Sequence, residues 1–273
     1  MNGNTGIIIF EALAALCALV AAVFIFDAHI QRPRPHKLMW SLGLLYYGIA
    51  AAAAWAGTAW GWNVAEYKLW YLFGGVMTAA YLGLGSLYLL APRHIGHIAT
   101  TIAALISIYA AVRILAFSVP AATTEALAHA STTNVTNVAK FNVFSSSLQT
   151  ATVLDLRLAA IVMNIPGALL LFGGAAWSAW QFYRKHFPRY RLISMALLAL
   201  GAIFPSILTG LQALGFTSAA ALGEFLGAIC LLTGLLISLD VFTVFRVPFT
   251  HIVVYERQPQ PLPLSQQPVN LGS

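Results

Sequence analysis

Apolar residues run along this chain in long stretches that are separated by short polar segments. Seven stretches are close to the length of about 20 residues that a helix needs to cross a bilayer. They cover residues 6–26, 38–60, 69–90, 98–118, 158–183, 192–214 and 220–245. Because a backbone in hydrocarbon must satisfy its own hydrogen bonds, each stretch is predicted to be a helix. The sequence therefore predicts an all-α fold, a seven-transmembrane-helix bundle formed as one domain by residues 1–245.

Two segments are too polar to belong to this bundle. Residues 119–156 are rich in Ala, Thr, Ser and Asn, and they predict a long loop. This loop contains a glycosylation sequon at Asn134, and the sequence does not decide whether it is used. Residues 246–273 include the proline-rich run 258–264 and predict a disordered tail.

The basic residues predict how the helices are oriented in the membrane. Ten Lys and Arg residues fall on one side of the predicted spans and three, Lys68, Lys140 and Arg157, on the other. Because cytoplasmic loops carry an excess of Lys and Arg, the N-terminus is predicted outside and the C-terminus in the cytoplasm. The aromatic residues from Trp60 to Tyr71 then fall at the outer interface, where they are expected to act as anchors.

The composition agrees with an integral membrane protein. Of the 273 residues, 60% are hydrophobic and only 8% are charged, whereas soluble domains average about 25% charged residues. The net charge of +6 arises mostly in the short loops between spans, so nucleic-acid binding is not predicted. The Ala-rich composition and compact loops favour a bacterial plasma membrane.

Three ionisable residues lie inside predicted spans, at one depth below the outer surface. Glu11, Arg113 and Glu224 are each four or five residues from the outer end of their stretch, which corresponds to about 6–8 Å of helix. Charged groups at this depth are expected to face the interior of the bundle, and Glu11 shares a helix face with alanines. They predict either a salt bridge that fixes helix register or the charged part of a ligand site.

Two prolines also fall at a common depth in the fifth and sixth stretches. Pro166 and Pro205 each remove a backbone donor and are expected to kink their helices. Asn164 and Gln212 lie near the same level. These residues predict an outward-facing pocket roofed by the 119–156 loop, with ordinary kinks in a packed bundle as the alternative.

No residue pattern predicts catalysis, a metal or another cofactor. The seven histidines are dispersed, and no pair of them faces another across the predicted bundle. The last stretch has no lysine of the kind that retinal proteins use, and no nucleophile or metalloprotease motif occurs. The chain is therefore expected not to be an enzyme.

Small residues recur at four-residue spacing in three stretches: Gly48-Ala52-Ala56, Gly75-Ala79-Gly83 and Gly223-Gly227. Such ridges let membrane helices approach closely. The leading hypothesis is a multi-pass protein that binds or transports a small molecule, lipid or ion from the outer side of the bilayer. The alternative is an accessory subunit that scaffolds a partner protein through these ridges or through the tail.

Overall fold

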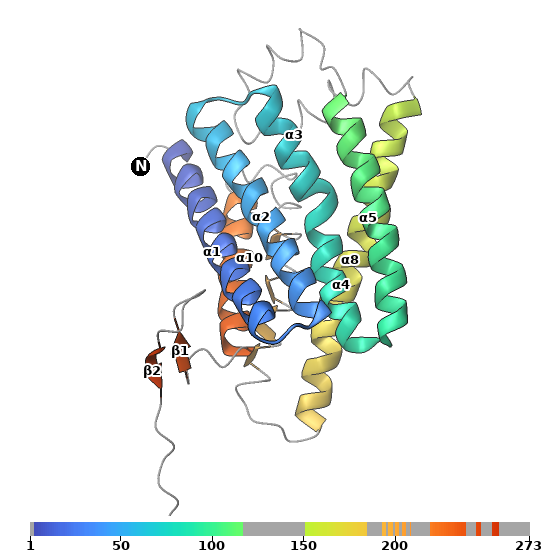
Figure 1. The fold of residues 1–273 in the computed structure, drawn as a ribbon. Helices are drawn as coiled ribbons and strands as arrows, with labels where there is room; N and C mark the ends of the chain where they lie inside the picture. Colours follow the sequence, from blue (N-terminus) through green and yellow to red (C-terminus); the bar gives the residue numbers. More distant parts are fainter. Residues whose placement is uncertain are drawn as a thin grey trace, which may run out of the picture.

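The computed structural model describes residues 3–116, 151–184, 219–238, 244–246 and 253–256, together with separate positions between 193 and 208. The elements are α1 (Gly3–Gln31), α2 (Pro35–Trp60), α3 (Val64–Leu72), η1 (Phe73–Met77), α4 (Thr78–Leu90), α5 (Arg93–Ala116), α8 (Ala151–Arg184), α10 (Ala219–Ser238), β1 (Val244–Arg246) and β2 (Val253–Glu256). The helices stand side by side in one bundle (Figure 1). The two strands pair as an antiparallel hairpin outside it.

Five spans within the described residues are long and apolar enough to cross a membrane, by length and composition. They are Thr5–Gln31, Pro35–Trp60, Val64–Leu90, Arg93–Ala116 and Leu158–Trp177. The apolar part of α10, Ala221–Ile237, is slightly shorter. Several long apolar helices in one bundle are compatible with a multi-pass membrane protein.

The structure modifies several predicted boundaries. The stretch predicted over 220–245 ends as a helix at Ser238, and Val244 already belongs to a strand that pairs with Glu256. The tail predicted to begin at residue 246 therefore starts within a β-hairpin. Helix α8 begins at Ala151, so the end of the predicted 119–156 loop is helical.

Other predictions fall wholly or partly on residues that the structure does not describe. The rest of the predicted loop, with Asn134, lies outside the described residues, and so does Gln212. The separate positions described between 193 and 208 are helical, in agreement with the stretch predicted there. The count of seven spans and the orientation of the termini stay predictions.

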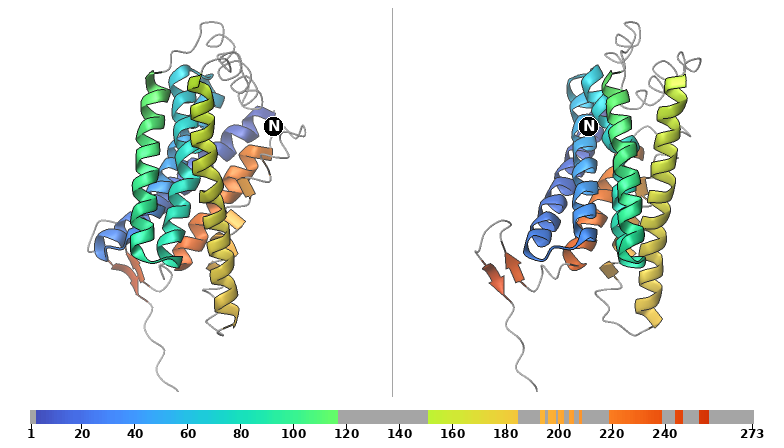
Figure 2. Two further views of the ribbon diagram at one scale, coloured as in Figure 1. Left: turned by 90° about the vertical axis from the view of Figure 1, so that its right-hand side faces the viewer. Right: turned by 45° about the vertical axis from the view of Figure 1, so that its right-hand side comes forward.

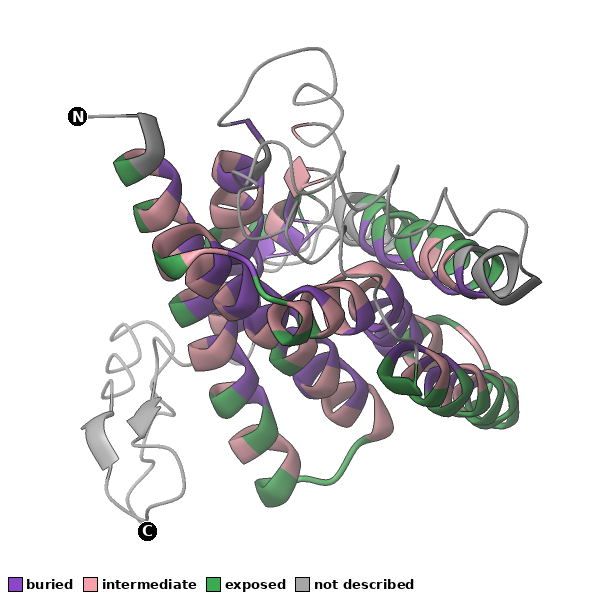
Figure 3. Cartoon of the chain, turned by 90° about the horizontal axis from the view of Figure 1, so that it is seen from above, coloured by how far each residue is buried: buried purple, intermediate pink, exposed green. Residues whose placement is uncertain are grey.

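The chain order places α1 between helices that are far apart in sequence. Helix α1 packs against α2 and against α10, whereas α4 packs against both α2 and α8. Helix α5 packs on α4 and α8, on the opposite side of the bundle from α1 (Figures 1 and 2). Seen from above, buried residues face the interior and exposed residues face outwards (Figure 3).

Glycines allow the closest of these contacts. A Cβ atom on Gly83 would come within 2.3 Å of the Gly167 carbonyl oxygen, and one on Gly167 within 2.4 Å of the Ala79 carbonyl oxygen. Gly48 accommodates Leu19 of α1, and Gly227 accommodates Pro205. The small-residue ridges predicted from the sequence thus hold this chain's own helices together.

The turn between α2 and α3 corrects the prediction for two aromatic residues. Gly61 has a φ of 97°, a conformation that favours glycine, and it turns the chain so that the Trp62 ring lies against Gly57. Trp62 and Tyr67 are therefore buried, with 2% of each exposed, and are not interfacial anchors. Trp60 is 73% exposed, as an anchor would be. The side chain of Asn63 and that of Glu66 form a capping box that starts α3.

Candidate functional site

A cavity of about 480 Å³ opens between the helices of the bundle. Its volume is within the range of about 300–1,000 Å³ that is typical of small-molecule sites. The described residues of its wall come from α2, the α3–η1–α4 unit, α8, the 193–208 region and α10. They are Tyr47, Ala50, Ala51, Trp70, Gly74, Gly75, Thr78, Ala79, Leu82, Asn164, Ala168, Leu171, Gly201, Pro205, Glu224 and Leu231.

A carboxylate on α10 forms part of this wall. Glu224 lines the cavity and is half-buried. Glu11 on α1 is close enough to Glu224 for the two carboxyl groups to interact electrostatically, and it is only 1% exposed. The rings of Phe10 and Phe225, the residues next to them in sequence, stack with centroids 5.7 Å apart. Packing between α1 and α10 therefore brings the two carboxyl groups together.

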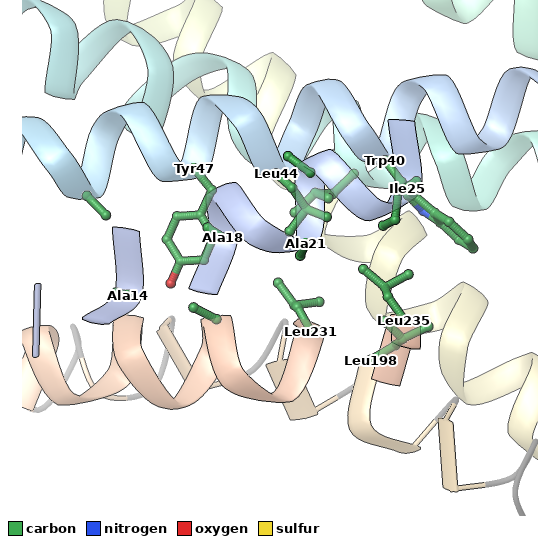
Figure 4. Packing of buried hydrophobic residues seen from close by; sticks show 14 of the residues in the cluster. Ala14, Ala18, Ala21, Ile25, Trp40, Leu44, Tyr47, Leu198, Leu231 and Leu235 are labelled. Atoms are coloured by element: carbon green, nitrogen blue, oxygen red, sulfur yellow. The ribbon is translucent and has the colours of Figure 1, made fainter. Parts of the chain in front are cut away.

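Helix α2 supplies the polar neighbours of this pair. The Tyr47 hydroxyl donates a hydrogen bond of 2.6 Å to the backbone carbonyl of Glu224. Figure 4 shows the Tyr47 side chain extending from α2 towards α10, among the alanines of α1. The Thr58 hydroxyl, which donates to the Ala54 carbonyl of its own helix, is also close enough to the Glu11 carboxyl group to interact with it. One carboxyl oxygen of Glu11, Oε2, is buried and has no hydrogen-bond partner.

On the opposite wall, an irregular helical turn meets the side chain of Asn164. The segment η1, Phe73–Met77, is a π-helical turn between α3 and α4, and such turns are frequent at functional sites. The Asn164 Nδ2 atom donates a hydrogen bond to the Gly75 carbonyl, and the Thr78 hydroxyl donates to the Phe73 carbonyl. Side chains therefore satisfy backbone acceptors at this depth, which a bilayer requires.

The structure brings together some of the residues predicted for the site and separates others. Glu224, Asn164 and Pro205 line the same cavity, and Glu11 lies beside Glu224. Arg113 is on α5, which does not pack closely against α1 or α10. The pairing of its guanidinium with the two carboxylates, one of the two arrangements expected from the sequence, is therefore not found.

The two prolines differ in their surroundings. Pro205 lies on the cavity wall and against Gly227. Pro166 is exposed on the outer face of α8 and does not line the cavity. Asn164, two positions earlier, does line the cavity. Pro166 can therefore affect the cavity only through the course of its helix.

Sequence reasoning missed Tyr47, Trp70 and the π-helical turn. Tyr47 sits among apolar residues in α2, and its hydroxyl finds a partner only because α10 lies beside it. The pair Gly74-Gly75 was a usable signal, because two adjacent glycines weaken a helix and mark places where it departs from regular geometry.

The arrangement offers acceptors and an apolar wall, and suits binding better than covalent chemistry. Glu224, Tyr47 and Asn164 line a wall built mainly of Ala, Gly and Leu, and the Glu11 carboxyl group interacts with that of Glu224. Within the described residues, no group of three or more His, Cys, Asp or Glu side chains could hold a metal ion.

No protein-family model, no curated protein and no solved structure matches the chain.

Proposed function

We propose that this protein is a multi-pass protein of a bacterial plasma membrane that binds a small molecule, lipid or ion entering from the outer side. The cavity between α2, α4, α8 and α10 supports this proposal most directly. It is large enough for a ligand of drug-like size, and its apolar wall carries a few polar groups, as ligand sites usually do.

The proposed orientation has the N-terminus outside and the C-terminus in the cytoplasm. It rests on the distribution of Lys and Arg between the two sides of the apolar stretches. With this orientation Glu11 and Glu224, which lie near the beginnings of α1 and α10, fall in the outer half of the bilayer. A ligand would then approach the carboxyl groups from the outer side.

Three residues form the polar part of the proposed site. Glu224 and Asn164 line the cavity from α10 and α8, and the Glu11 carboxyl group interacts with that of Glu224. Buried ionisable groups in membrane helices are costly and commonly mark ligand or ion sites. Arg113 is not part of the proposed site, because α5 lies apart from α1 and α10.

The test is to narrow the cavity and to ask what the protein still retains on purification. Ala168 lines the cavity from an exposed position on α8, so Ala168→Phe places a ring there with little disturbance of packing. Ala176→Phe is the matched control, because Ala176 is exposed on the same helix and does not line the cavity.

Small molecules and lipids extracted from the purified proteins would be compared by mass spectrometry. We expect at least one species to be retained by wild type and by Ala176→Phe but lost from Ala168→Phe. The same species in the same amounts in all three proteins would contradict a ligand site in this cavity.

A further inference from the structure

The parts of α1, α2, α4, α8 and α10 that surround the two carboxyl groups and the cavity contain no basic residue. Residues 1–28, 38–67, 69–92, 158–183 and 193–245 contain no Lys, Arg or His. These ranges include most of α1 and α2, all of α10 and the parts of α4 and α8 that line the cavity. The basic residue of α8 nearest to Asn164 is Arg157, seven residues or about 10 Å of helix towards the outer end.

The absence of a nearby positive charge matters most for Glu11, because this residue is buried. Its side chain is 99% buried, since only 1% of the residue is exposed, and Oε2 has no hydrogen-bond partner. The charged residue that interacts with it electrostatically is Glu224, another acid. Buried charges are normally paired, because removing an unpaired charge from water is costly. Glu11 thus has an unpartnered carboxyl oxygen close to a second acid, Glu224, which lies on the cavity wall, and a positive charge in the cavity would be attracted to both.

The walls of the cavity indicate which kind of cation would fit. Inorganic cations such as Na⁺ and Ca²⁺ prefer a shell of oxygen ligands, whereas this wall is mainly Ala, Gly and Leu. The aromatic rings of Tyr47 and Trp70 also line it. Aromatic faces attract ammonium groups, and an apolar wall accepts alkyl or aryl substituents.

We propose that the site takes an organic cation with apolar substituents, whose positive charge is drawn to the Glu11–Glu224 pair. This inference rests on the proposed function and adds the chemical class of the ligand. The cation offsets the repulsion between the two carboxylates, and its apolar part fills the space between α2, α4 and α8. A neutral or anionic molecule of the same shape gains nothing from the carboxyl pair.

The test uses two ions of nearly equal size and shape but opposite charge, tetraphenylphosphonium and tetraphenylborate. Their equilibrium binding to the purified protein would be measured in nanodiscs of zwitterionic phosphatidylcholine, with empty nanodiscs subtracted. We expect saturable binding of the phosphonium ion to wild type, at least about tenfold tighter than that of the borate ion. Competition by an excess of tetraphenylarsonium should remove it.

Substitutions of the two acidic residues then show which carboxyl group attracts the phosphonium ion. Glu224→Gln and Glu11→Gln should each weaken phosphonium binding at least about fivefold, and the double variant should bind the two ions equally. Asp27→Asn is the matched control, because it removes an acidic group from the opposite end of α1 and should leave binding unchanged. Size-exclusion profiles and melting temperatures of the variants would show that they remain folded.

Wild type could bind both ions equally, and Ala168→Phe could fail to bind either of them. The cavity would then be a ligand site without preference for cations, which overturns the inference but leaves the proposed function standing. Absence of saturable phosphonium binding to wild type also overturns the inference. Because the comparison of the two ions uses wild type alone, it remains decisive even if a Gln variant does not fold.

Discussion

Tyr47 shows how a single hydroxyl group links the cavity wall to the packing of two helices. The residue is 8% exposed, and its ring lies between α1 and α10 while its hydroxyl donates to the Glu224 carbonyl. The same residue lines the cavity. The hydrogen bond therefore fixes the position of α10 along the axis of α2, and with it the position of Glu224 on the cavity wall.

Removal of this hydroxyl should lower stability by a modest amount. We expect Tyr47→Phe to reduce the free energy of unfolding by about 0.5–1.5 kcal/mol, because a buried hydrogen bond between helices is lost while the ring is kept. Thr101→Val serves as the control, since the exposed Thr101 hydroxyl donates to the His97 carbonyl of its own helix. The free energy of unfolding of both variants would be measured in mixed micelles. Equal losses of stability in the two variants would contradict a specific role for Tyr47.

At the scale of whole elements, the crossing of α4 and α8 depends on the absence of side chains. Gly83 and Gly167 bring the two backbones into contact, and Asn164 joins α8 to η1 one turn away. The crossing positions one wall of the cavity. Any atom added between the two backbones must push the helices apart, because protein interiors are closely packed.

Two glycines of α8 allow a matched comparison. Gly167→Ala should reduce the free energy of unfolding by about 1–3 kcal/mol, because the new methyl group would lie 2.4 Å from the Ala79 carbonyl oxygen. Gly173→Ala should be neutral or stabilising by up to about 1 kcal/mol, since a Cβ there meets no atom within 4 Å and alanine favours the helix. Thermal unfolding followed by circular dichroism would measure both. A similar loss in the two variants would refute the close crossing.

The helical elements and part of the site could be predicted from the sequence, whereas the neighbours of each helix could not. Apolar length located the helices, and the alanines beside Glu11 showed which face of α1 is buried. Depth alone, however, placed Arg113 with the two carboxylates, because residues at one depth can lie on any side of a bundle. Similarly, Trp62 looked like an anchor until the turn at Gly61 was known.

For the whole molecule, the proposed orientation can be tested at two described positions, one near each end of the helices. Cys17 and Cys230 would first be replaced by alanine, and single cysteines introduced at Ala65 or Arg32, both of which are exposed. A membrane-impermeant maleimide should label Ala65→Cys in intact cells and Arg32→Cys only after permeabilisation. The reverse pattern would place Glu11 and Glu224 towards the cytoplasm and would remove the proposed outer access.

The contact between α1 and α10 has a consequence for biosynthesis. Helix α1 finds one of its neighbours only when the chain has been synthesised beyond residue 219. Until then Glu11 has to remain in the bilayer, at a cost, without the surface that finally covers it. Nascent chains that end before α10 leave this acid without that cover, so α1 is fully packed only after α10 has been made.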